Sequence, residues 1–116
     1  MEMLLSIDFH FSASHALPFY EGQCKRLHGH NYVLQVTLAG RPSPKDGMIR
    51  DFDEIKQTVA QQVLSKVDHY HLNDIVENPT AENIVVWMWE RLSPIITGLK
   101  EIKLWETPEY CVTYRA

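Results

Sequence analysis

Two stretches within the first forty residues alternate between apolar and polar side chains, and this period of two limits the possible folds more than any other feature. The first is LLSIDFHFSASH, residues 4–15, whose apolar row ends on His15. The second is HGHNYVLQVTLAG, residues 28–40, whose apolar row begins with His28 and His30. Because successive side chains of a strand point to opposite faces, the pattern predicts two half-buried strands.

The period changes in the middle of the chain and returns to two near its end. Residues 51–67 place apolar side chains three to four apart, which predicts an amphipathic helix. A second helix is predicted within 77–96, with Thr80 as its N-cap. Residues 99–106 and 110–116 are predicted as two closing strands around a short turn. This order of elements predicts an α+β fold, in which an antiparallel sheet carries two helices on one face.

The composition restricts the class of protein. The chain has 116 residues, of which 45% are hydrophobic and 22% charged, so we expect one domain over residues 1–116 with its own core. The formal charge of -4 argues against a nucleic-acid binder, which usually has a basic face. The sequence contains neither an apolar run of about 18 residues nor a recognisable signal peptide, so we expect no membrane span. We therefore expect a cytoplasmic protein with two free thiols, Cys24 and Cys111.

Four strands leave two sheet edges, and these edges must be protected or paired. Pairing between subunits into a closed barrel would remove them. A chain of this size also has little volume for a deep pocket of its own. We therefore expect a homo-oligomer in which a neighbouring subunit completes the active site.

Three histidines occupy the apolar faces of the first two predicted strands. His28 and His30 are two residues apart, so their rings project to the same side. If the strands are antiparallel neighbours, His15 can join them. Neutral imidazole is a good zinc ligand, and three protein ligands leave a fourth position open, as in catalytic sites. The alternative is that each is a hydrogen-bonded histidine of the core.

Cys24 lies in the loop before the histidine pair, next to Lys25 and Arg26. Positive neighbours and a metal dication would favour its thiolate, which can act as a base or as a nucleophile. The alternative is a small buried apolar residue, and we expect that role for Cys111, which lies inside an alternating strand.

Two carboxylates are further candidates. Asp68 precedes His69, and a carboxylate can orient an imidazole for proton transfer; His71 competes for this role, and spacing does not choose between them. Glu106 ends the apolar row of a predicted strand, where it needs a partner such as a heterocycle edge with two N–H donors. A solvated strand end is the alternative for Glu106.

Six motifs, in this order, resemble the 6-pyruvoyltetrahydropterin synthase family: FSASH, CKRLHGHNY, DGMIRDF, VDHYHLN, NPTAENI and WETPE. The short gap between Cys24 and H-G-H is similar to that of the bacterial 6-carboxytetrahydropterin synthase branch, which serves queuosine and other deazapurine biosynthesis. The resemblance implies the tunnelling fold, with a four-stranded antiparallel sheet and two helices. It also implies that three subunits close a barrel and that two trimers stack into a hexamer, with active sites between subunits.

The resemblance also implies roles for individual residues. By position, it implies one zinc ion per subunit, and the zinc ligands would be His15, His28 and His30. Cys24 would be the base that abstracts a proton.

The Asp-His motif of the family matches Asp68 and His69, which selects His69 over His71 for the proton relay. Glu106 would anchor the pterin ring and share in that relay. Thr80 would lie near the substrate.

The implied substrate is 7,8-dihydroneopterin triphosphate, and the implied products are 6-carboxytetrahydropterin, acetaldehyde and triphosphate, with no redox cofactor. Lys25 and Arg26 are candidates for contacts with the triphosphate. Two alternatives stay open. One is a related enzyme on the same scaffold, either a pyruvoyl-forming synthase or an aldolase-like pterin enzyme. The other is a non-catalytic module that binds zinc or a pterin.

Overall fold

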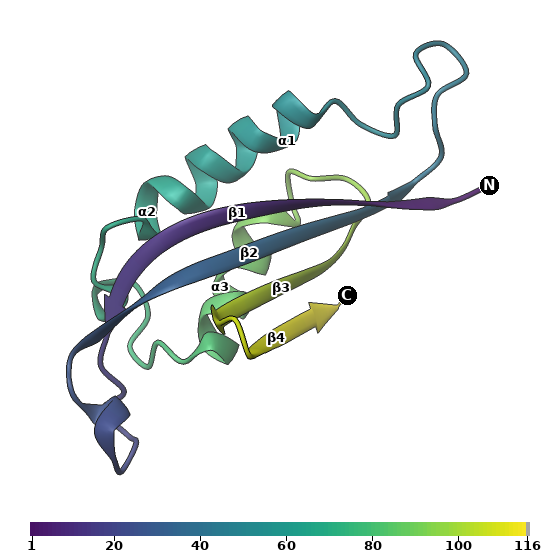
Figure 1. The fold of residues 1–116 in the computed structure, drawn as a ribbon. Coiled ribbons are helices and arrows are strands. Elements are labelled where there is room, and N and C mark those ends of the chain that lie inside the picture. Colours follow the sequence, from purple (N-terminus) through teal and green to yellow (C-terminus); the bar gives the residue numbers. More distant parts are fainter. Residues whose placement is uncertain (116) are drawn as a thin grey trace.

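In the computed structural model, which describes residues 1–115, four strands form one antiparallel sheet in the order β1-β2-β3-β4 (Figure 1). The strands are β1 at Met3–His15, β2 at His28–Gly40, β3 at Leu99–Thr107 and β4 at Tyr110–Arg115. The four predicted strands are confirmed, apart from Ala116, which lies outside the described residues. No helix in the described part of the chain is long and apolar enough to cross a membrane.

The helices lie on one face of the sheet (Figure 1). They are α1 at Phe52–Val59, α2 at Ser65–Val67 and α3 at Ala81–Leu92, and a π-helical segment at Ala60–Leu64 joins α1 to α2. The predicted helix over 51–67 is therefore one continuous helical run. In its wider π-helical part, the Gln62 carbonyl accepts a hydrogen bond from Arg91 of α3, which ties the two helices together.

The core lies between the sheet and the helices. The alternating rows of β1, β2 and β3 bury one face of each strand, and the helices contribute apolar side chains such as Ile55 and Met88. Across β1 and β2, Phe11 lies opposite Tyr32, and their rings stack with centroids 4.8 Å apart. The same buried face continues into the histidines at the ends of both strands.

The outer edge of β1 is covered only near its C-terminal end, within the described residues. There, a bridge joins Ser14 to His71, and the Ser14 N–H donates to the Tyr70 carbonyl at 3.1 Å. The Ser12 carbonyl accepts from the His69 N–H at 2.6 Å. These bonds hold the segment after α2 against the part of β1 that carries His15. The earlier part of β1 and the outer edge of β4 pair with no segment of residues 1–115.

Leu104→Ala should lower the free energy of unfolding by about 2–5 kcal/mol, because it leaves a cavity at a fully buried position opposite Leu34. Urea unfolding would measure the loss. Leu27→Ala, at a side chain that is 69% exposed, is the matched control and should change stability by about 0.5 kcal/mol or less. Equal effects of the two substitutions would contradict this placement of the core.

Candidate metal centre and active site

The antiparallel register of β1 and β2 brings three histidine rings together at one end of the sheet. His15 lies opposite His28, and Ala13 lies opposite His30. The Nε2 atoms of His15 and His28 are 3.0 Å apart, and the three ring centroids are 4.5, 4.8 and 5.1 Å from one another. The structure therefore gathers the three histidines that the sequence places on apolar faces.

A carboxylate from β3 joins the histidines. Glu106 Oε1 lies 3.0 Å from His15 Nε2 and 3.1 Å from His30 Nε2. Together with His28, these residues offer four ligand atoms that all lie within 4.8 Å of one another. We call this set of four residues the histidine–glutamate group. A set of three imidazoles and one carboxylate can hold a metal ion.

Two backbone carbonyls fix which ring nitrogens face the centre of the group. His15 Nδ1 lies 2.8 Å from the Pro79 carbonyl, and His28 Nδ1 lies 2.7 Å from the Arg26 carbonyl. Because a carbonyl can only accept, each Nδ1 carries a hydrogen, and each neutral ring presents its Nε2 lone pair to the other. Two lone pairs at 3.0 Å repel each other unless a cation lies between them.

The ring of His30 shows whether a proton or a metal ion fits the group better. His30 Nε2 is buried and has no hydrogen-bond partner among the described residues, because its approach to Glu106 lacks hydrogen-bond geometry. One extra proton on His15 would relieve the contact with His28 but would leave His30 Nε2 unsatisfied. A metal ion would satisfy all three nitrogens, so the residues present fit a metal.

The electrostatics of the group depend on the Glu106 carboxylate. Burial lowers the pKa of His15, but its hydrogen bond with Glu106, the Pro79 carbonyl and the charge of Glu106 outweigh burial and raise this pKa overall. The hydrogen bond with His15 lowers the pKa of Glu106 against the effect of burial. Burial lowers the pKa of His30, and the neighbouring His15 and His28 lower it further, despite the nearby carboxylate.

Cys24 lies beside this group in a single 3-10 turn at Gln23–Lys25. It is exposed and lines a cavity of about 400 Å³ together with His28 and His30. The alternative of a small buried residue is therefore wrong for Cys24. It is also wrong for Cys111, which is exposed because it pairs with Trp105 on the sheet face away from the helices.

Asp68 and His69 form a pair at the covered edge of β1. The Asp68 carboxylate accepts from the Ser12 N–H at 3.0 Å and lies 3.0 Å from His69 Nδ1. His69 adopts a left-handed backbone with φ of 66°, which is strained for a non-glycine residue, and its side chain is 81% exposed. His71 instead places Nδ1 3.0 Å from the Ser14 hydroxyl, so the carboxylate pairs with His69 and not with His71.

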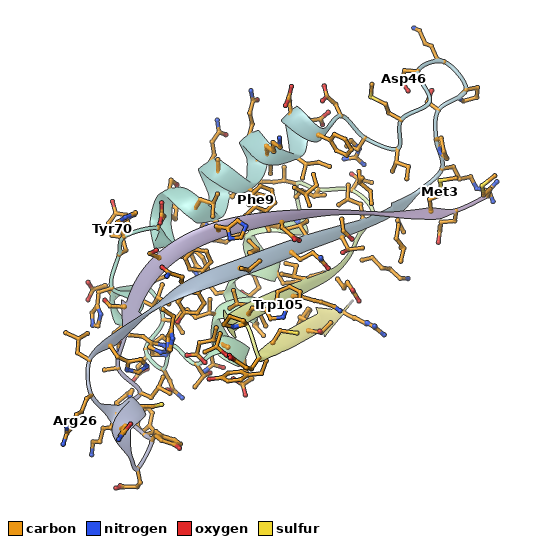
Figure 2. The ribbon with its side chains drawn as sticks, in the orientation of Figure 1. Met3, Phe9, Arg26, Asp46, Tyr70 and Trp105 are labelled. Carbon is orange, nitrogen blue, oxygen red and sulfur yellow. The ribbon has the colours of Figure 1, made fainter. Side chains whose placement is uncertain are left out.

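His30 borders two cavities at this end of the sheet. A cavity of about 570 Å³ is lined by His30, His69 and His71, whereas Cys24 lines the other cavity. Figure 2 shows Arg26 in the loop between β1 and β2 and Tyr70 after α2, at the same end of the sheet. Within one chain, Cys24 and the Asp68–His69 pair therefore face different spaces.

Two further residues support the site. Thr80 caps α3, since its hydroxyl accepts from the Asn83 N–H at 3.2 Å, and this cap holds the preceding Pro79 carbonyl near His15. The Asn73 side chain binds both backbone groups of Ala16, at 2.9 and 2.8 Å. Sequence reasoning gave Asn73 no role, because an amide that clamps a distant backbone has no local pattern.

Comparison with known proteins identifies the family. Residues 4–116 match the family described as 6-pyruvoyl tetrahydropterin synthase. The chain belongs to this family. A solved structure of 6-pyruvoyl tetrahydropterin synthase from Caenorhabditis elegans superposes with a TM-score of 0.90 at 30% identity, covering 100% of this chain and 96% of that chain. The four-stranded sheet with two helices is thus the fold of the 6-pyruvoyl tetrahydropterin synthase family.

Relatives within this family carry different names. A 6-carboxy-5,6,7,8-tetrahydropterin synthase of Synechocystis is 36% identical over 86% of this chain and 83% of its own. A dihydroneopterin monophosphate aldolase of Pyrococcus furiosus is 39% identical over 88% of each chain. The relatives of this chain therefore include proteins named for different reactions of pterins.

Thr80→Ala should destabilise the protein by about 1 kcal/mol, because α3 loses its N-cap. Thr80→Ser should keep most of the stability, since serine supplies the same acceptor. Thermal unfolding of both variants would check this. If Thr80→Ala left stability unchanged and altered only substrate binding, the capping role would be wrong.

Proposed function

We propose that this chain is a zinc-dependent lyase that converts 7,8-dihydroneopterin triphosphate and one water to 6-carboxy-5,6,7,8-tetrahydropterin, acetaldehyde and triphosphate. The observation that carries the proposal is the histidine–glutamate group, in which two fixed Nε2 lone pairs and a buried orphan nitrogen converge beside an exposed thiol. Membership of the family and the relatives named as 6-carboxytetrahydropterin synthases support the choice of reaction. The product would serve queuosine or another deazapurine pathway.

Zinc is the proposed metal, with one ion per subunit held by His15, His28 and His30. Ligand atoms bound to one tetrahedral zinc at about 2.0–2.1 Å lie roughly 3.3 Å apart, close to the 3.0 Å between two of these nitrogens. The two carbonyl-bound Nδ1 atoms supply the outer hydrogen bonds that orient metal-binding imidazoles. When bound, the ion would act as a Lewis acid that polarises the side-chain oxygens of the substrate.

The remaining residues would handle the substrate and its protons. We assign Cys24 as the base that takes a proton from the substrate side chain, because its thiol is exposed at the cavity it shares with His28. Asp68 would hold the Nδ1–H of His69, so that His69 Nε2 is free to carry a proton. Glu106 would hold the pterin ring through its N–H donors, and Thr80 would lie nearby.

The active enzyme is proposed to be a hexamer, a dimer of trimers, with its sites between subunits. The exposed His69 ring and the exposed Cys24 thiol line separate cavities in one chain, so a neighbouring subunit would have to bring the two together. The free edges of β1 and β4 offer backbone groups for closing a barrel.

We also propose which residues bind the triphosphate and in which compartment the protein works. Exposed Lys25 and Arg26 lie next to Cys24 and would meet the triphosphate. Both cysteines are free and exposed, which suits a reducing compartment such as the cytoplasm. We treat residues 1–116 as one pterin synthase domain.

An aldolase reaction is the second candidate function, because one relative carries that name. The dihydroneopterin monophosphate aldolase shares 39% identity with this chain, so an aldolase acting on a phosphorylated dihydroneopterin is the competing proposal. A retro-aldol cleavage would leave the phosphate on a two-carbon fragment, glycolaldehyde phosphate. The proposed lyase instead releases free triphosphate and acetaldehyde. The sister pyruvoyl-forming activity would release triphosphate and no aldehyde.

Product identification separates these reactions. We expect the zinc-loaded protein, incubated without oxygen with 7,8-dihydroneopterin triphosphate, to form 6-carboxytetrahydropterin with matching acetaldehyde in mass spectrometry. A parallel incubation with 7,8-dihydroneopterin monophosphate is the comparison. Turnover of the monophosphate alone, with glycolaldehyde phosphate as product, would replace the proposed function by the aldolase.

Cys24→Ala should give a folded, metal-loaded protein whose turnover falls by roughly a hundredfold or more, because a positioned general base is lost. Cys111→Ala removes the other exposed thiol, on β4, and should keep wild-type turnover. Bound zinc and kcat would be measured for both. Wild-type kcat in Cys24→Ala would remove the thiol from the mechanism.

A further inference from the structure

We propose that Glu106 binds the metal directly as the fourth ligand when no substrate is present, and that the substrate has to displace it. This inference rests on the metal centre of the proposed function. It differs from the ring-anchoring role of Glu106, because it gives the same carboxylate a second position in the substrate-free enzyme. The fourth position of the centre would then be closed until a pterin arrives.

The contacts of Glu106 support this assignment. Its Oε1 atom lies 3.0 Å from one ligand nitrogen, on His15, and 3.1 Å from another, on His30. The two nitrogen contacts involve the same oxygen, so that oxygen occupies a corner of the histidine–glutamate group. Its side chain is 15% exposed, and a carboxylate that has lost most of its hydration is stabilised by a positive partner. Within residues 1–115, no lysine or arginine pairs with Glu106, because the arginine of β4, Arg115, pairs with Glu101 instead.

The strand geometry explains how the side chain reaches the histidines. Trp105 pairs with Cys111 and Thr107 pairs with Tyr110, so the register shifts by one residue between them. Glu106 is therefore the extra residue of a β-bulge relative to β4, and along β3 it continues the face that buries Ile102 and Leu104. Since Trp105 also pairs with Val33, Glu106 arrives beside the end of β2 that carries His30.

An alternative account makes a prediction of opposite sign. If Glu106 served only as the counter-ion of a protonated His15, its removal would make His15 easier to deprotonate and would leave metal affinity equal or higher. If Glu106 binds the metal, its removal must weaken binding. The net effect on metal affinity therefore separates the two accounts.

The experiment compares metal binding by four proteins: the wild type, Glu106→Gln, Glu106→Asp and Glu101→Gln. Zinc affinity would be measured by competition with a chromophoric chelator, and the ligand set by the d–d absorption of the Co²⁺-loaded proteins. Glu106→Asp keeps the charge but shortens the reach by one methylene group. Glu101→Gln is the control. It removes another carboxylate of β3, which pairs with Arg115 and does not belong to the histidine–glutamate group.

We expect Glu106→Gln and Glu106→Asp each to weaken zinc binding by roughly tenfold or more and to change the Co²⁺ spectrum, with Glu101→Gln at wild-type values. Wild-type affinity in Glu106→Gln would overturn the inference. Weakening in Glu106→Gln with a wild-type affinity and spectrum in Glu106→Asp would show that the charge acts at a distance, and would overturn it too. Thermal unfolding of the metal-free variants would confirm that they fold.

The displacement step has its own readout. Neopterin carries the ring and the side-chain hydroxyls without phosphate, so it should change the Co²⁺ spectrum of the wild type as Glu106 leaves the metal. An unchanged spectrum, with neopterin binding verified by its fluorescence, would overturn the displacement.

These results are separable from the proposed function. Absence of metal binding by the wild type would remove the proposed centre, and the inference with it. Loss of metal in His28→Ala together with unchanged metal binding in Glu106→Gln would keep the centre and remove only the fourth ligand. An unexpected pterin product would change the reaction and leave the ligand assignment standing.

Discussion

The register between β1 and β2 is the constraint on which the rest of this structure depends. It places His15 opposite His28 and Ala13 opposite His30, on the face that also buries Phe11 and Tyr32. Because side chains alternate along a strand, a slip of one residue would turn the whole apolar row of one strand to the opposite face. The core that fixes the register therefore also fixes the positions of the residues in the candidate metal centre.

The strands bring the histidine rings together, but two loop carbonyls determine which nitrogen of each ring carries its hydrogen. The Pro79 carbonyl, just before α3, and the Arg26 carbonyl, just before β2, hold the Nδ1 atoms of His15 and His28. Both nitrogens that face inward are thereby prepared to donate electron pairs. The Thr80 cap that starts α3 positions the first of these carbonyls, so a helix end far along the chain sets the chemistry of the end of β1.

The sequence predicts the fold well because each strand and helix has a clear local period, and all the predicted elements occur within one or a few residues of their expected bounds. The sequence could also predict the clustering of His15, His28 and His30, since it follows from alternation and one assumed strand pairing. It could not predict the exposure of Cys111, because alternation does not reveal which face the helices cover. The contact of Glu106 with the histidines depends on the pairing of β3 with β2, which alternation within one strand does not specify, and the Asn73 clamp on Ala16 depends on tertiary structure.

The chain separates its chemistry into a buried part and an exposed part. In the histidine–glutamate group His15 is fully buried and the other three residues are half-buried, whereas the Cys24 thiol and the His69 ring face solvent in different cavities. Proton transfer between groups at a substrate requires both within hydrogen-bond reach of it, and water at such a site would compete for the protons. His69 nevertheless keeps a strained backbone that aims its ring outward. Such strain persists only where the surroundings enforce it, and here the bonds of Ser12 to Asp68 and His69 do so. An outward-facing, well-held imidazole suits the proposed arrangement in which active sites lie between subunits.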